Sequence, residues 1–148
     1  MKIKSDLEHL RDIIFAEADD DEENMRMIGS TVLNRMEAKK GKEFGSNIPE
    51  IIKKGYYGIS NPQYKLAEGK TFSDIASAMK FKKAHVIAEK LLSDKKYRSQ
   101  GMFYFTPEEE EKLKVENERR IKNKQPHKFN FGVVKLVGKT KRYNVYSY

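Results

Sequence analysis

A glutamate on an apolar helix face is the residue of this sequence whose position most suggests chemistry. Leu10, Ile13 and Ile14 recur at helical spacing, and Glu17 follows the last two by four and three residues. The period of the α-helix therefore places Glu17 on the apolar stripe. An ionised carboxylate removed from water is costly unless it is paired or protonated. The spacing thus predicts a raised pKa for Glu17, as a general acid working near neutral pH requires.

A salt bridge at the helix end is the other role open to Glu17. The candidate partners are Arg11, Arg26 and Arg35. The five acids that follow, Asp19–Glu23, are a different case, because they stand at the predicted start of the next helix. Asp20 and Glu23 have the spacing of a capping pair, and negative charge is favoured at a helix start. We expect these acids to cap that helix and to raise the pKa of Glu17 by repulsion.

The elements that must position Glu17 are mostly helices. Ser5 and Glu8 have capping-box spacing, which predicts a first helix from Asp6 to Ala18. A second helix should follow the acidic run and stop at Gly41. Further helices are predicted over 49–54, stopped by Gly55, from Ser73 to about Met79, and over 81–94 with Val86, Ile87 and Leu91 inward. A last helix is predicted from Thr106-Pro107 onward, with the ion pairs Glu108–Lys112 and Glu110–Lys114.

The remaining segments indicate a loop and two extended regions. Gly, Ser, Asn and Pro crowd residues 55–64, which predicts a loop. Residues 102–106 are short, apolar and aromatic, and suit a buried strand. Residues 128–148 carry β-branched and aromatic residues around Gly138, and predict a terminal hairpin. The expected fold is α+β and mainly helical, with a small C-terminal β-hairpin.

Composition limits the classes of function. The 148 residues suit a single domain, and the absence of cysteine excludes a disulfide framework and a thiolate zinc site. Three scattered histidines argue against a metal site, and no cofactor is expected. A net charge of +8 favours an anionic partner: nucleic acid, an acidic membrane surface or a bacterial wall polymer. No apolar run could span a membrane, and the first residues lack a signal peptide's apolar core, so we expect synthesis in the cytoplasm.

Four motifs, in chain order, resemble those of the SleB-like cell wall hydrolases, the family of the spore-cortex-lytic enzymes and related phage lysins. Ala16-Glu17-Ala18 and Val32-Leu33-Asn34-Arg35 are similar to the ends of the family's first two helices. Gly101–Pro107, GMFYFTP, resembles its Gly-Ala-Leu-Tyr-Phe-x-Pro segment. The loop YYGISNP stands where the family has a Gln-Phe-Ser-type loop that lines the groove. The resemblance spans most of residues 7–107.

The resemblance implies a lysozyme-like fold and cleavage of the peptidoglycan glycan strand between N-acetylmuramic acid and N-acetylglucosamine. The family's essential carboxylate corresponds to Glu17. With one carboxylate, the implied reaction is lytic transglycosylation: the acid protonates the glycosidic oxygen and then helps the muramoyl 6-hydroxyl to close a 1,6-anhydro ring. Ordinary glycoside hydrolases need a second carboxylate. Residues 1–148 would form one catalytic domain of a phage or prophage lysin, or of a virion-borne enzyme, that acts on the bacterial wall.

The implied substrate-binding residues are Tyr57, Ser60, Asn61, Tyr104 and Thr106. Tyrosine rings suit the apolar face of a sugar, and the polar side chains suit an acetamido group or a water. Packing is the alternative role for the tyrosines, and turn formation is the alternative for Ser60 and Asn61. Asn34 and Arg35 are expected to fix the second helix against its neighbours. The sequence departs from the family at Asp19-Asp20-Asp21, where Arg-Gly-Glu is usual, and the charged helix after Pro107 looks like an elaboration.

Three other functions stay open on the sequence alone. A basic nucleic-acid-binding module could use the lysines and tyrosines of residues 135–148 as phosphate contacts and stacking groups. Against it, no known binding motif is present and glutamates interrupt the lysines, so no nucleic-acid partner is expected. A muramidase of the same fold and an inactive relative with a structural role are the others. The sequence leaves the oligomeric state open.

Overall fold

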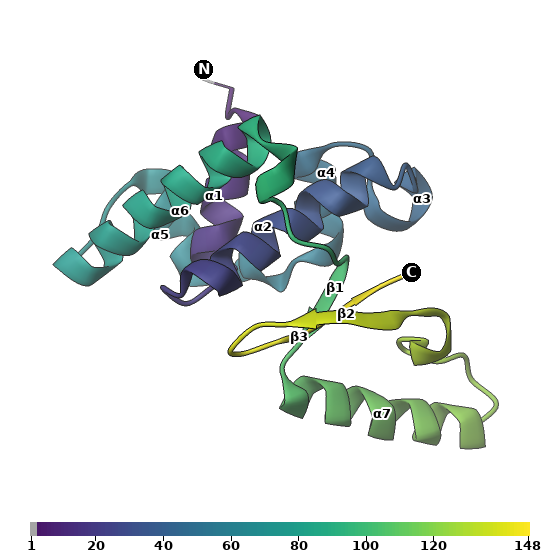
Figure 1. The fold of residues 1–148 in the computed structure, drawn as a ribbon. Coiled ribbons are helices and arrows are strands. Elements are labelled where there is room, and N and C mark those ends of the chain that lie inside the picture. Colours follow the sequence, from purple (N-terminus) through teal and green to yellow (C-terminus); the bar gives the residue numbers. More distant parts are fainter. Residues whose placement is uncertain (1–2) are drawn as a thin grey trace.

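Helices α1 to α6 form the N-terminal lobe of the structure, a computed structural model that describes residues 3–148. Figure 1 shows α1 within this lobe, and α2, α4, α5 and α6 all contact it. The helix that ends in Glu17 is therefore the centre of the core. The bounds are α1 Asp6–Glu17, α2 Glu22–Glu37, α3 Gly41–Phe44, α4 Ile48–Gly55, α5 Pro62–Gly69 and α6 Ile75–Ser93, with the 3-10 turns η1 Tyr57–Ser60 and η2 Lys95–Tyr97.

The start of α1 is the capping box that the sequence predicts. The Ser5 hydroxyl accepts the Glu8 backbone N–H, and the Glu8 carboxylate accepts the Ser5 N–H. Leu10, Ile13 and Ile14 are fully buried, as their spacing indicates. Burying a side chain of this kind contributes about 1.5–3 kcal/mol. Cap and core together fix where the helix ends, and so where its last residue lies.

The C-terminal lobe is a three-stranded antiparallel sheet with one helix against it. Its elements are β1 Phe103–Phe105, α7 Pro107–Lys122, the 3-10 turn η3 Phe131–Val133, β2 Lys135–Lys139 and β3 Asn144–Ser147. The strand order is β1-β3-β2, so the hairpin β2–β3 predicted at the C-terminal end is confirmed and β1 joins its β3 side. The fold is mainly helical with a small antiparallel sheet.

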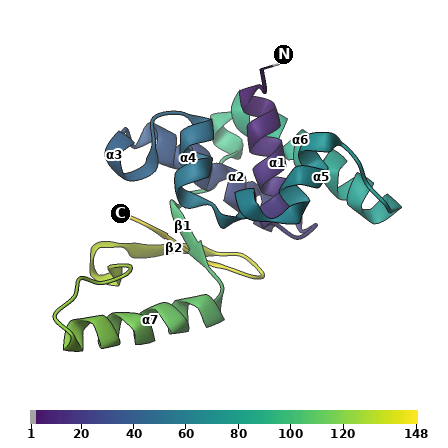
Figure 2. The same ribbon diagram turned by 180° about the vertical axis from the view of Figure 1, so that it is seen from behind.

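Aromatic rings fill the space between the sheet and η3. The Phe129 ring lies 5.0 Å from Phe103, 5.0 Å from Phe105 and 4.9 Å from Phe131, centroid to centroid. In both Figure 1 and Figure 2, the sheet lies between the helical lobe and α7, and β1 is the segment that descends from one lobe into the other. Residues at the top of β1 therefore belong to the junction of the two lobes.

Four local predictions are wrong. Residues within 55–64 form η1 and the start of α5 instead of a loop, because Asn61 caps α5 and Pro62 is its first residue. The predicted helices 73–79 and 81–94 are one helix, α6, capped by Asp74. Val86, expected inside, is 50% exposed, whereas Ile87 and Leu91 are buried as predicted. The cap of α2 is Asp21, whose side chain accepts the Asn24 N–H, and not Asp20.

Most of the predictions for α7 are confirmed. Thr106 caps the helix in a capping box with Glu109, and Lys114 lies 3.4 Å from the Glu110 carboxylate. Within residues 3–148 no ion pair joins Glu108 to Lys112, so that predicted pair is not formed. No described helix is long and apolar enough to cross a bilayer.

Candidate active site

Glu17 is the last residue of α1 and lies at the junction of the two lobes. The buried residues before it hold the helix in the core, and Ala18, buried as well, ends it by leaving the helical conformation. The side chain of Glu17 is half-buried. The prediction that this carboxylate shares the apolar face of α1 is confirmed.

Two donors reach the Glu17 carboxylate, each from a different segment. The backbone N–H of Gly58 in η1 donates to Oε1 at 2.7 Å. The hydroxyl of Tyr104 in β1 forms the second hydrogen bond. Glu17 is thus held in one position by the turn after α4 and by the strand that links the lobes.

Gly58 is required by this close approach. A Cβ at position 58 would lie 2.7 Å from the Cγ of Glu17 and 2.9 Å from its Oε1, closer than side chains pack. The backbone can donate to the carboxylate only because no side chain stands between them.

The pKa of Glu17 is raised above the ordinary value for glutamate. Burial is the main cause, because it disfavours the charged form. The hydrogen bonds from Gly58 and Tyr104 act in the opposite direction, as does the positive charge of Arg35. The nearby carboxylate that raises the pKa further is Glu109 of α7. The balance keeps a proton available on Glu17 at a higher pH than a solvated glutamate would allow.

The salt bridge considered for Glu17 is not formed, because each candidate arginine is engaged elsewhere. Arg11 pairs with Asp12 at 2.9 Å, and Arg26 pairs with Glu23 at 3.2 Å. Arg35 donates from Nε to the Met102 carbonyl at 2.7 Å. Its guanidinium also lies over the rings of Phe44, Tyr56 and Phe103, 4.8 to 5.2 Å from their centroids.

Asn34 and Arg35 fix α2 against β1, as predicted. The Asn34 side-chain amide donates to the carbonyls of Ser99 and Gly101 at 3.0 and 2.8 Å. Together with the hydrogen bond from Arg35 to Met102, these make three hydrogen bonds between the end of α2 and the segment that leads into β1. The orientation of Tyr104, two residues after Met102, depends on them.

Tyrosines surround the buried side of Glu17. Tyr104 packs edge-on against Tyr143 at 5.1 Å and lies 6.3 Å from Tyr56, centroid to centroid. The Tyr56 hydroxyl is paired with Thr31 at 2.7 Å. Burial raises the pKa of Tyr104 well above its usual value, and the neighbouring Glu17 charge acts in the same direction. The Tyr104 hydroxyl therefore stays protonated and can act only as a neutral hydrogen-bonding group here.

The acids after Ala18 serve mainly as a cap. Asp21 caps α2, and the Asp19 carboxylate accepts the Asp21 N–H and the Asn24 amide, at 3.1 and 3.0 Å. Lys141 in the β2–β3 turn lies 3.4 Å from Asp21, so this acidic turn also touches the C-terminal lobe. The charge that most raises the pKa of Glu17 comes from Glu109 and not from these acids.

The predicted substrate-binding residues divide into two groups. Tyr57 is 89% exposed, and Tyr104 contacts Glu17. The other three make local contacts: Ser60 donates to the Tyr57 carbonyl, Asn61 caps α5, and Thr106 caps α7. Turn and cap formation accounts for those three side chains.

A groove of about 590 Å³ opens between η1 and α7. Tyr57 is on one side, and α7 contributes Glu109 and Lys112 on the other. Its full lining is Tyr57, Phe105, Glu109, Lys112, Leu113, Glu116, Lys128 and Phe129. Glu17 does not line this groove, but Glu109 does, and the charge of Glu109 acts on the Glu17 carboxyl.

Sequence reasoning missed Gly58, Glu109 and Tyr143. A glycine in a turn carries no sign of a long-range contact, and Glu109 reads as an ordinary member of a capping box. Tyr143 lies just before β3, and the folding of the β2–β3 hairpin brings it against Tyr104. One feature of the sequence could have pointed to Gly58. It follows two adjacent tyrosines, Tyr56 and Tyr57, and has no side chain, so its backbone can approach another group closely.

No group of three or more His, Asp or Glu side chains within residues 3–148 is arranged to hold a metal ion. Comparison of the chain with protein-family models, with curated proteins and with solved structures gave no match.

Proposed function

We propose that this protein is a peptidoglycan lytic transglycosylase of lysozyme-like architecture, with Glu17 as its single acid and base. The observation that carries the proposal is the state of Glu17: it is half-buried, its pKa is raised, two donors hold it, and the carboxylate of Glu109, which lines an open groove, lies near enough to act on it. These are the properties that a carboxyl group needs to deliver a proton to a bound substrate near neutral pH. The motif resemblance described for residues 7–107 supplies the substrate class.

The proposed reaction uses one carboxyl group twice, first as an acid and then as a base. Protonated Glu17 gives its proton to the glycosidic oxygen, the bond from that oxygen to C1 of N-acetylmuramic acid breaks, and positive charge develops at C1. The carboxylate then accepts the proton of the muramoyl 6-hydroxyl while O6 bonds to C1. The product is a 1,6-anhydro ring, and Glu17 returns to its starting form without a water molecule being consumed. The donors Gly58 and Tyr104 stabilise the carboxylate between the two steps.

The groove supports a saccharide substrate. The exposed ring of Tyr57 offers an apolar face to a sugar ring, and Phe105 and Phe129 add apolar surface to the groove wall. The net charge of +8 favours approach to the anionic bacterial wall. We propose the wall as the site of action, and a phage or prophage lysin, free or carried in a virion, as the biological setting.

Hydrolysis is the second candidate, and Glu109 is the observation that favours it. Its carboxylate lines the groove and is close enough to Glu17 to raise the pKa of that group. A second carboxylate across a substrate groove can activate water, which gives a reducing sugar end in place of the anhydro ring.

The nucleic-acid alternative loses two of the three tyrosines of residues 135–148 as stacking groups. Tyr143 is buried against Tyr104, and the hydroxyl of Tyr146 donates to Glu110 while its ring packs on Phe105 and Phe131. Base stacking needs free aromatic faces, which these two tyrosines do not present.

Mass spectrometry of the products tests the proposal. Purified protein, its Glu17→Gln variant and a Glu118→Gln control, which changes an exposed glutamate on α7, are each incubated with peptidoglycan. We expect anhydromuropeptides from the wild type and the control and none from Glu17→Gln. Reducing muropeptides that disappear in Glu109→Gln would establish the hydrolase instead. Equal products from wild type and Glu17→Gln would remove Glu17 from the mechanism.

A further inference from the structure

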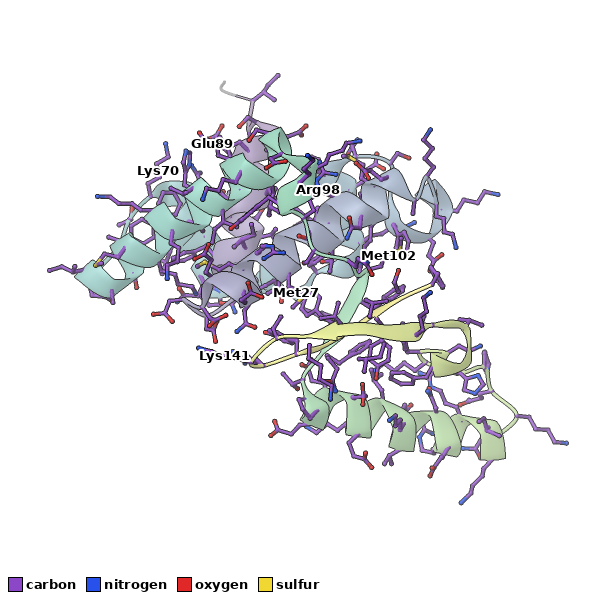
Figure 3. The ribbon with its side chains drawn as sticks, in the orientation of Figure 1. Met27, Lys70, Glu89, Arg98, Met102 and Lys141 are labelled. Carbon is purple, nitrogen blue, oxygen red and sulfur yellow. The ribbon has the colours of Figure 1, made fainter. Side chains whose placement is uncertain are left out.

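A second groove lies between the helical lobe and the hairpin, away from Glu17. It consists of two adjoining hollows of about 550 and 330 Å³, and both are lined by Arg98, Ser99, Gln100 and Val137. We call this continuous surface the hairpin groove. Figure 3 shows Met27 and Met102, which also line it, where the helices face the hairpin. The hydrogen-bond partners of Glu17 do not line it, so it is separate from the candidate active site.

The charge of the hairpin groove is positive. Its basic residues are Arg26, Lys95, Arg98, Lys135 and Lys139, and its acidic residues are Glu23 and Glu37. Both acids are already paired: Glu23 with Arg26 at 3.2 Å, and Glu37 with Arg98 at 2.5 Å and Lys95 at 3.5 Å. A ligand that enters the groove therefore meets excess positive charge.

Two cations are left without an acidic partner. Lys135 and Lys139 are exposed on β2, and within residues 3–148 neither has an ion pair. They line opposite ends of the groove, and Val137 lies between them, where the pairing register of β2 with β3 shifts. The Ser99 hydroxyl between these ends is buried and also lacks a hydrogen-bond partner among the described residues. The groups that the groove offers to a ligand are thus two exposed ammonium ions, which suit an acceptor-rich, anionic ligand.

The wall of the groove opposite β2 is held in place. The Ser99 N–H donates to the buried Ser30 hydroxyl at 3.0 Å, and the Asn34 amide holds the carbonyls of Ser99 and Gly101. Arg98 donates from Nε to the Leu91 carbonyl at 3.1 Å. A wall fixed by four such bonds loses little conformational freedom when a ligand binds.

The groove lacks a free aromatic platform. Tyr148 is the aromatic residue among its described lining residues, and the Lys40 ammonium lies 3.9 Å from the centroid of that ring. The Tyr148 hydroxyl donates to Glu43. Single-stranded nucleic acid is bound largely by stacking of its bases, so this surface favours a phosphate polymer that carries no bases.

We propose that the hairpin groove binds a polyol phosphate polymer of the bacterial wall, with Lys135 and Lys139 as contacts to two of its phosphates. This proposal rests on the proposed action on the wall. Polymer binding gives the protein a second contact with the wall. The polymer occupies the hairpin groove while the glycan strand occupies the groove between η1 and α7. Two linked contacts raise the effective concentration of each binding partner at the other site.

Binding of labelled polyglycerol phosphate, measured by fluorescence anisotropy at two salt concentrations, tests the proposal. The variant is Lys135→Gln/Lys139→Gln, and Lys122→Gln/Lys124→Gln is the control, because it removes the same charge from exposed positions at the end of α7. We expect the groove variant to lose about tenfold or more in affinity and to show a weaker salt dependence, since fewer counterions are released. The control should bind like the wild type within about twofold. Equal loss in both variants, or no binding by the wild type, would overturn the proposal, as would tighter binding of a single-stranded oligonucleotide at these lysines.

The test separates this proposal from the proposed function. Peptidoglycan stripped of its phosphate polymer is given to the wild type and to the groove variant, and released muropeptides are measured. Equal cleavage by both proteins is expected, since the lysines lie outside the active site. Cleavage of peptidoglycan without polymer binding would contradict only the proposal for the hairpin groove. Polymer binding without cleavage would contradict only the proposed transglycosylase activity.

Discussion

At the scale of single residues, the candidate site depends on where one carboxyl group is placed. Glu17 is not a member of the acidic run that follows it, although the two are adjacent in sequence. The run caps α2 in contact with solvent and the hairpin turn, whereas Glu17 lies beneath a backbone amide and a tyrosine hydroxyl. Adjacent acids thus have different surroundings, because Glu17 ends α1 at the junction of the lobes whereas the acids after Ala18 start α2.

The raised pKa of Glu17 predicts a stability effect that depends on pH. A carboxyl whose pKa is higher in the folded than in the unfolded chain contributes most below the unfolded pKa, about 4.5, and this contribution is lost as pH rises through the folded value. Glu17→Gln removes the buried charge and keeps an oxygen for the Gly58 N–H. We therefore expect Glu17→Gln to be more stable than the wild type at pH 8, with a difference that shrinks towards pH 4.

Urea unfolding at a series of pH values measures this difference, with Glu118→Gln as the exposed control. A constant difference across the series would show that Glu17 ionises as it would in water.

Gly58 gives a second prediction at this scale. Gly58→Ala places a Cβ within 3 Å of three atoms of the Glu17 side chain, so the carboxylate or η1 must move. We expect about 1–3 kcal/mol of destabilisation and a loss of most muropeptide release. Gly138→Ala is the matched control, because no atom lies within 4 Å of a Cβ there. Normal activity in Gly58→Ala would show that the Gly58 amide is not needed to hold Glu17.

At the scale of elements, the ends of helices decide which polar residues are free for substrate. Thr106, expected to bind substrate, uses its hydroxyl to accept the Glu109 N–H at 3.1 Å. The side-chain carbonyl oxygen of Asn61 accepts the Gln63 N–H at 2.9 Å. Residues that the resemblance assigns to the groove are here engaged in starting α7 and α5.

Thr106 therefore tests a structural role against a binding role. We expect Thr106→Ala to lower the free energy of unfolding by about 1 kcal/mol through the lost cap, and Thr106→Ser to retain stability. Both should keep the wild-type KM for soluble peptidoglycan fragments. An increase in KM in Thr106→Ala, without an equal loss of stability, would restore Thr106 to the binding site.

The same elements show what could be predicted from the sequence. The start of α1, the face of Glu17, the β2–β3 hairpin and the start of α7 follow from local spacing and caps, and all are confirmed. Asn61-Pro62 predicts a loop, but the same two residue types that favour turns also start helices, and here they start α5. The continuity of α6 was missed because Ile75, Met79 and Val86 are apolar yet exposed, which obscures its buried face.

Contacts between distant segments set the limit of prediction for the site. The pairs Gly58–Glu17, Tyr104–Glu17 and Tyr143–Tyr104 join residues that are far apart in sequence and have no shared pattern. Arg35 looked like a partner for a carboxylate, but a carbonyl and three aromatic rings take its guanidinium. Spacing could identify Glu17, but it could not identify what surrounds it.

At the scale of the whole molecule, the two lobes share one core. Tyr143 and Val145 of the C-terminal lobe are buried together with the helical core residues, and the Asn34 and Arg35 contacts cross the junction. We expect one cooperative unfolding transition, with the tyrosine signal and the helix signal changing together.

Near-ultraviolet and far-ultraviolet circular dichroism, followed in the same thermal scan, measure this. Val145→Ala should lower both midpoints together, because its side chain, 3% exposed, packs at the junction. Two separate midpoints would mean that the lobes are independent units and that the site at their junction can open without unfolding.

The strand order β1-β3-β2 has a consequence for the timing of synthesis. β1 follows the helical lobe directly, but its partner β3 is made only after α7 and β2 have left the ribosome. Until then β1 is an unpaired edge and Tyr104 lacks Tyr143, so the environment of Glu17 is incomplete while its helix is already formed. The nascent chain thus carries Glu17 before it carries the strand that completes its surroundings, and we expect the proposed activity only after the sheet has closed.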